Sequence, residues 1–149
     1  LARHVLKDQS LHEFIPELNT TLGDALLATH RCYLREINSL RFSNVKIKGL
    51  VHITGGGLID NPPRILPEHV SLEIDSGSWD VPPIFPYLQH KGNLDQKEMH
   101  RVFNMGLGML VIVDSGQSLL VEHAFASREC YRIGKIVKRN NGLPVKCCV

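Results

Sequence analysis

Three stretches of the chain carry the apolar patterns expected of strands. Residues 70–75 alternate between apolar and polar side chains, which predicts a strand with one buried face. The apolar run over 45–53, broken by two lysines and a glycine, predicts a second strand. The uninterrupted run over 109–113 predicts a third, and a run of this kind favours a central strand covered on both faces.

The C-terminal region has the pattern of two strands joined by a turn. Residues 132–139 predict a strand, and Asn140-Asn141-Gly142 follows it directly. Asn-Gly pairs favour the tight turns that connect adjacent antiparallel strands. The pattern therefore predicts a hairpin that returns through 145–148.

Helical periodicity separates these strands. Apolar residues recur at helical spacing in several segments, and capping signals mark their ends. The predicted helices cover 1–7; 31–40, with Tyr33, Leu34, Ile37 and Leu40 on one face; 83–91, ending at Gly92; a segment capped by Asp95 with Glu98, burying Met99, Val102 and Phe103; and about 114–127, with Leu120, Val121, Ala124 and Phe125 inward.

The stretch 8–21 is expected to be irregular, and 22–27 has no clear type. Strands that alternate with helices indicate an α/β fold with α+β character, in which helices are layered on a mixed β-sheet. A chain of 149 residues is long enough for one domain with its own core, so we expect a single domain over 1–149.

Composition is that of an ordinary globular protein, with 43% hydrophobic and 21% charged residues. No run approaches the roughly 20 apolar residues of a membrane helix, and a net charge of +2 is too small to indicate nucleic-acid binding. The four cysteines form no C-x-x-C pair, which predicts free thiols in a reducing compartment and no metal site.

The clearest candidate for chemistry is the bend Thr54-Gly55-Gly56-Gly57, between the predicted strand over 45–53 and a short helix opening at Leu58. Glycines let the backbone approach a ligand closely, and free N–H groups at a helix start attract anions. The residues alone leave a purely structural turn equally open, since neither the G-x-G-x-x-G nor the Walker pattern is present.

Other candidates flank this bend or lie in a second loop, and each has a plainer alternative. His52 could donate to a phosphate or move a proton, or be a structural strand residue. Arg64 could bind phosphate or form a surface ion pair. Asn61 lies beyond the glycines, and Asn104, Gly106 and Gly108 precede the apolar run; these are candidate substrate contacts or turn residues. Trp79 is expected in the core or at a dimer interface.

Three ordered segments, 49–67, 75–85 and 98–109, resemble the aminoimidazole ribonucleotide synthetase (phosphoribosylformylglycinamidine cyclo-ligase) family. The likeness runs from about residue 1 to about 137 and covers only the C-terminal half of that enzyme. Residues 28–33 depart from the family's usual Thr-Pro-Thr-Arg-Ile-Tyr, and Pro62 replaces a more common aliphatic residue.

The resemblance implies an ATP- and Mg²⁺-dependent ring closure that converts formylglycinamidine ribonucleotide into aminoimidazole ribonucleotide. It implies a cytoplasmic homodimer in which this chain is the substrate-side domain. Most of the ATP and Mg²⁺ contacts would then belong to an N-terminal domain absent from this sequence, so the chain is expected to be an inactive part by itself. Thr54, Gly55, Gly56 and Gly57 would contact the substrate phosphate, with His52 the candidate for proton transfer.

Two other interpretations stay open at this point. Selenophosphate synthetase, thiamine monophosphate kinase and the large amidotransferase of purine synthesis share related domains. A non-catalytic domain for dimerisation or sugar-phosphate binding would use the same fold without chemistry.

Overall fold

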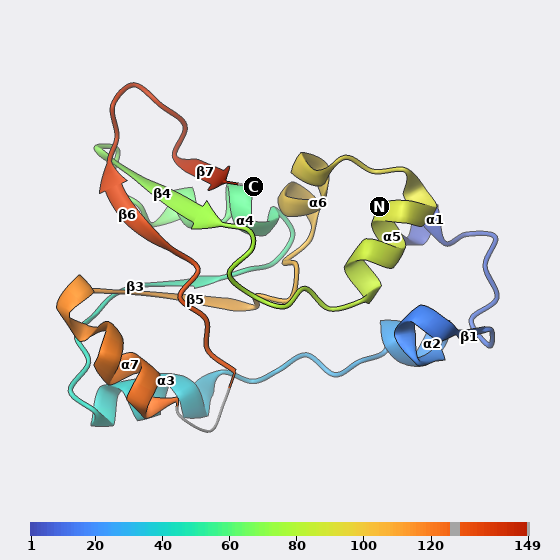
Figure 1. The fold of residues 1–149 in the computed structure, drawn as a ribbon, viewed down its shortest axis with the longest axis horizontal. Coiled ribbons are helices and arrows are strands. Elements are labelled where there is room, and N and C mark those ends of the chain that lie inside the picture. Colours follow the sequence, from blue (N-terminus) through green and yellow to red (C-terminus); the bar gives the residue numbers. More distant parts are fainter. Residues whose placement is uncertain (126–128, 149) are drawn as a thin grey trace.

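A two-stranded ribbon and a separate three-stranded sheet organise the fold in the computed structural model, which describes residues 1–125 and 129–148 (Figure 1). In the ribbon, β3 (Ile47–His52) pairs antiparallel with β5 (Met109–Val113), and His52 lies opposite Met109. The register shifts at Gly49, where a Cβ atom would lie 2.7 Å from the Ile65 side chain. The ribbon ends where the glycine bend begins, so β3 fixes the position of the bend.

Two helices cover one face of the ribbon. α3 (Leu34–Phe42) and α7 (Ser118–Ala124) lie side by side below it in Figure 1. Leu40, Val45 and Phe125 form the buried centre of this smaller cluster, against apolar residues of β3 and β5. Burial of this apolar surface holds the helix pair against the ribbon.

The second sheet is mixed, as predicted. β4 (Val70–Asp75) lies in the middle, with β6 (Gly134–Lys138) antiparallel on one side and β7 (Val145–Cys148) parallel on the other. Leu72 and Ile74 of β4 point into the core, as the alternation indicated.

The predicted hairpin is wrong, because β7 does not pair with β6. The connection crosses the beginning of β4 instead: the N–H of Arg139 donates to the carbonyl of His69 at 2.8 Å, and the N–H of Leu72 donates to that of Pro144 at 2.9 Å. Asn141 does adopt the left-handed conformation that its turn signal indicates, with φ 48°. The six intervening residues are enough to span β4, and β4 supplies pairing edges on both its sides.

Most of the remaining elements lie beyond the His52–Met109 end of the ribbon. They are α1 (Ala2–Val5), β1 (Phe14–Ile15), β2 (Thr20–Thr21), α2 (Leu22–Leu26), α4 (Gly57–Asp60), α5 (Ile84–Gly92) and α6 (Gln96–Val102), with 3₁₀ turns at Pro16–Leu18 and Pro62–Arg64. A further 3₁₀ turn, Ser115–Gln117, lies at the opposite end, between β5 and α7. The stretch 8–21, expected to be irregular, thus contains the small β1–β2 pair.

Several helix boundaries differ from the prediction. α3 begins at Leu34 rather than at residue 31, and Leu34, expected inward, is 65% exposed. α5 continues through Gly92, and Asn93 takes the left-handed position after it. A 3₁₀ turn precedes α7, Leu120 is 47% exposed instead of buried, and the predicted end near residue 127 lies outside the described residues.

β5 is not the central strand that its continuous apolar run suggested. Among the described residues it pairs with β3 alone, and most of its side chains are half-buried. An unbroken apolar run indicates that both faces of a strand contact apolar groups, but it carries no information about how many strands pair with it.

The main core joins the second sheet, α4, α5 and α6 to the bend. Trp79 lies in it at 6% exposure, and its indole N–H donates to the carbonyl of Met105 at 2.9 Å. Half of the predicted capping box is present, since the Asp95 carboxylate accepts from the N–H of Glu98 at 2.8 Å. Within the described part of the chain, no helix has the length and apolarity needed to cross a membrane.

Candidate functional site

The glycine bend offers two free backbone donors. Of its four residues, Thr54 donates its N–H to the side chain of Asn61 at 2.6 Å, and Gly57 donates to the carbonyl of Thr54 at 2.9 Å. The N–H groups of Gly55 and Gly56 have no acceptor among the described residues. α4 is a single turn, so its dipole contributes little to anion binding. The bend would therefore bind an anion through these two free N–H groups.

Asn61 holds the bend in shape. Its side chain is 2% exposed, accepts from the N–H of Thr54 and donates to the carbonyl of Gly55 at 3.2 Å. A buried amide satisfied on both sides within one loop fixes the backbone of that loop. Asn61 therefore supports the predicted ligand contacts of its neighbours by positioning the bend.

The three glycines differ in their backbone conformation and in the atoms that a side chain at each position would meet. A Cβ atom at Gly55 would meet nothing within 4 Å, so this residue is open to solvent and to a ligand. Gly56 (φ 112°) and Gly57 (φ 53°) adopt backbone conformations that favour glycine. Gly57 is also buried, with its Cα against the backbone of α6, so its lack of a side chain serves packing.

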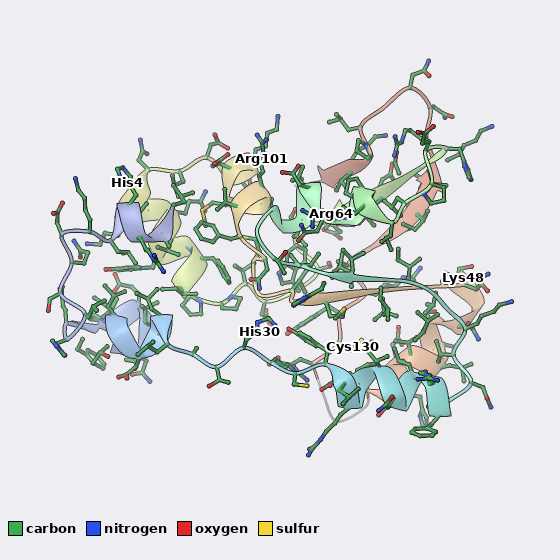
Figure 2. All side chains as sticks on the ribbon, turned by 180° about the vertical axis from the view of Figure 1, so that it is seen from behind. His4, His30, Lys48, Arg64, Arg101 and Cys130 are labelled. Carbon is green, nitrogen blue, oxygen red and sulfur yellow. The ribbon has the colours of Figure 1, made fainter. Side chains whose placement is uncertain are left out.

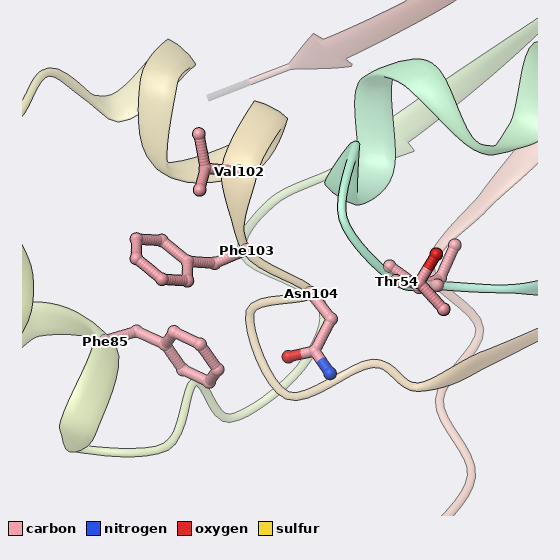
Figure 3. A pocket seen from close by; sticks show the side chains of 6 residues that line it. Thr54, Phe85, Val102, Phe103 and Asn104 are labelled. Carbon is pink, nitrogen blue, oxygen red and sulfur yellow. The ribbon is translucent and has the colours of Figure 1, made fainter. Parts of the chain in front are cut away.

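A shallow pocket adjoins the bend (Figure 3). It has a volume of about 240 Å³ and is lined by Ile53, Thr54, Phe85, Val102, Phe103 and Asn104. The rings of Phe85 and Phe103 lie 6.0 Å apart and form its apolar side. Because ligand pockets usually measure about 300–1,000 Å³, this one suits part of a ligand, such as a sugar.

Asn104 joins the second candidate loop to the pocket. Its side-chain oxygen accepts from the N–H of Gly106 at 3.0 Å, which leaves its amide nitrogen without a partner among the described residues. Gly106 has a φ of 95° and lies against Pro82. The structure thus brings Thr54 and Asn104 to the lining of one pocket.

Gly108 has a packing role. It is buried, its carbonyl accepts from the N–H of Ile53 at 2.9 Å, and the hydroxyl of Tyr33 occupies the space that a side chain would need. Burial of the phenol raises the pKa of Tyr33; Arg31 opposes this rise and Glu36 adds to it. Through its contact with Gly108, Tyr33 anchors the segment before α3 to the end of the ribbon.

Arg64 is the candidate least connected to the bend. Figure 2 places it beside α4, and its side chain forms no ion pair within the described residues. Arg101 on α6 instead pairs with Asp60 of α4, at 3.4 Å. Arg64 remains a predicted phosphate ligand that the structure neither brings to the pocket nor engages elsewhere.

His52 has a partner that the sequence did not indicate. Its Nε2 atom lies 3.2 Å from Nε2 of His30, which lies in the segment between α2 and α3 (Figure 2). Both side chains are exposed. The two histidines are 22 positions apart and His30 lies in an irregular segment, so no periodic pattern in the sequence indicates their contact. No sequence pattern indicates the contact between Phe85 and Phe103 at the pocket either.

No cluster for a hard cation is present in the part of the chain that is described. Mg²⁺ prefers several carboxylate and water oxygens, and no group of three or more His, Cys, Asp or Glu side chains gathers within residues 1–125 and 129–148. These residues therefore do not fit a Mg²⁺ site.

Comparison with known proteins finds one matching family model, described as AIR synthase related protein, C-terminal domain, over residues 1–145. The chain is 45% identical over 136 residues to a protein named phosphoribosylformylglycinamidine cyclo-ligase from Thermoanaerobacter sp. (strain X514), covering 90% of this chain and 40% of the relative. Proteins of the same name from Pseudothermotoga lettingae and Bifidobacterium animalis subsp. lactis are 42% and 41% identical, over 96% and 95% of this chain and 43% and 42% of theirs. The chain thus spans about two-fifths of the length of these relatives.

Proposed function

The chain belongs to the family of the AIR synthase related protein C-terminal domain, and from this we propose that it is the substrate-side domain of an ATP-dependent cyclo-ligase. The reaction converts formylglycinamidine ribonucleotide into aminoimidazole ribonucleotide in purine biosynthesis. The names of the relatives and their identity across nearly the whole chain support this proposal.

The observation that carries the proposal is the pair of free N–H groups at Gly55 and Gly56, beside a pocket of partly apolar character. The substrate ends in a ribose 5′-phosphate. Two adjacent free amides suit phosphate oxygens, and the open space around Gly55 lets such oxygens approach. The phosphate would bind at the bend and the ribose would enter the pocket, where Thr54 and Asn104 supply polar groups.

The other candidate residues complete this assignment. His52 is the group we propose for proton transfer near the reacting end, since imidazole is the side chain that enzymes use most often as a general acid or base and this one is exposed beside the bend. Arg64 would add a positive charge to the phosphate site. Binding and orientation of the two reacting ends is the main contribution that phosphoryl-transfer chemistry asks of a protein.

ATP and Mg²⁺ take part in the proposed reaction, but we propose no binding site for them among the described residues. ATP activates the formamide oxygen of the substrate as a leaving group. Because the described residues do not fit a Mg²⁺ site, we assign nucleotide and metal binding to a second, N-terminal domain, as the longer relatives suggest. We further propose that the complete enzyme is a cytoplasmic homodimer.

A chimera tests the catalytic assignment. Residues 1–145 replace the matching segment of the Thermoanaerobacter relative, and ATP-dependent formation of aminoimidazole ribonucleotide is measured. We expect turnover from the chimera and none from the relative lacking that segment. A folded chimera that hydrolyses or binds ATP yet closes no imidazole ring would contradict the proposed function.

A further inference from the structure

The pair formed by His30 and His52 has the geometry of a two-ligand metal chelate. Both Nε2 atoms face one another at 3.2 Å, and the ring centroids lie 5.3 Å apart with a 57° tilt. Two imidazoles bound at about 2.0–2.1 Å to a tetrahedral ion place their nitrogens roughly 3.3 Å apart. We propose that His30 and His52 together bind a divalent transition-metal ion such as Zn²⁺ or Ni²⁺, with the remaining coordination positions open to water.

The fold holds both imidazoles in place before any ion arrives. His52 ends β3, where pairing with Met109 of β5 fixes its backbone. His30 is held through Tyr33, whose hydroxyl packs on Gly108 and whose ring meets that of His30 edge-on, with centroids 6.0 Å apart. Because Tyr33 already holds the two segments together, binding of an ion costs little further conformational entropy.

Charge around the pair permits a cation. Arg31, next to His30 in the chain, is the nearest charged side chain in sequence, and it is engaged by Glu36 at 3.0 Å and by Glu129 at 3.6 Å. Its positive charge is therefore offset by two carboxylates. Both histidines are exposed, so an ion can enter from solvent.

Ligand type decides which ions are taken. Imidazole nitrogen suits Zn²⁺, Ni²⁺ and Cu²⁺, whereas Mg²⁺ requires oxygen ligands. Within the described residues no third His, Cys, Asp or Glu joins the pair, so the exposed thiol of Cys32 is not part of the cluster. The site should therefore hold its ion through two protein ligands, and more weakly than a closed structural zinc site does.

Each metal-bound nitrogen must present a lone pair. The two Nε2 atoms lie within hydrogen-bonding distance without an ion, and a ring that binds the ion through Nε2 carries its proton on Nδ1. A tautomer change of this kind moves one proton between the two nitrogens of one ring. This step needs no oxidant or additional reactant.

Nickel titration tests the site without reference to any enzymatic activity. The chain is titrated with Ni²⁺ alone under thiol-reducing conditions, followed by calorimetry and by paramagnetic broadening of amide signals. We expect one site, with broadening centred on residues 29–31 and 51–53, and no competition from excess Mg²⁺. His30→Gln and His52→Gln should each weaken Ni²⁺ binding by at least about tenfold. Loss of a residue that only hydrogen-bonds to a metal ligand already lowers metal affinity by about that factor, and these variants remove a ligand itself.

Two matched variants serve as controls. His90→Gln removes another exposed histidine, on α5, and Cys32→Ser removes the neighbouring thiol; both should bind Ni²⁺ as the parent chain does. The proposal is overturned if Ni²⁺ does not bind at millimolar concentration, if broadening centres elsewhere, or if His30→Gln binds with the parent affinity. The broadening map of the parent chain decides the question even if a variant fails to fold.

Discussion

Replacing Gly57 with alanine should destabilise the protein strongly, because two separate penalties fall on this residue. Its φ of 53° lies in the left-handed region, which costs an L-residue about 1–2 kcal/mol. A Cβ atom would also overlap the carbonyl of His100 and lie 2.7 Å from that of Phe103. These are backbone atoms of α6 and its end, so α4 and α6 would have to separate.

Overpacking against fixed neighbours costs about 1–3 kcal/mol, and together the two terms give roughly 2–5 kcal/mol. That is a large part of the about 5–15 kcal/mol that holds a typical domain folded. Equilibrium urea unfolding followed by Trp79 fluorescence measures the loss, because this single tryptophan is buried in the same core. With a slope of about 1–3 kcal/mol per molar urea, the midpoint should fall by roughly 1 M or more.

Gly55→Ala is the matched control. It adds the same methyl group two residues earlier, where nothing lies within 4 Å and the backbone is outside the left-handed region. We expect a change of less than about 1 kcal/mol, in either direction. Equal destabilisation by the two variants would refute the packing role of Gly57 and the close approach of α4 to α6.

Three further changes probe the same structure. Asn61→Ala removes the side chain that accepts from the N–H of Thr54, and should cost about 1–3 kcal/mol in urea unfolding and speed amide exchange at Thr54, whereas unchanged exchange would contradict its supporting role. Asp95→Ala removes the α6 cap and should cost about 1 kcal/mol by thermal denaturation, with Asp95→Asn nearly neutral. Burial chiefly, and Glu122 secondly, raise the pKa of the Cys130 thiol, so Glu122→Gln should lower it and shift the pH profile of Cys130 alkylation to lower pH; a profile that stays in place would rule out that electrostatic coupling.

Local signals in the sequence predicted much of the fold. The alternation in 70–75 and the capping residue Asp95 report chemistry confined to a few neighbouring residues, and both elements form where expected. The position of β7 depends on which strand edge is free after β4 and β6 have paired. No turn signal at Asn140–Gly142 contains that information, so the hairpin prediction failed.

The candidate site divides in the same way. Thr54 and Asn104 each lie in a loop beside an apolar run, a local pattern that the sequence shows, and the structure brings both to one pocket. The separate roles of the glycines could not be read from their spacing, since these depend on α6 packing against Gly57 and on Tyr33 covering Gly108. His30 was missed because its contact with His52 is made across an irregular segment.

The central claim is that the free amides of Gly55 and Gly56 bind the phosphate of a ribonucleotide. The most direct measurement is a titration of the ¹⁵N-labelled chain with ribose 5-phosphate, with ribose as the phosphate-free control. The largest downfield shifts of backbone N–H signals should occur at Gly55 and Gly56, with smaller shifts at Thr54 and Asn104, and ribose should leave the two glycines unmoved. Unshifted glycine amides while another surface responds, or equal shifts with ribose, would contradict the claim.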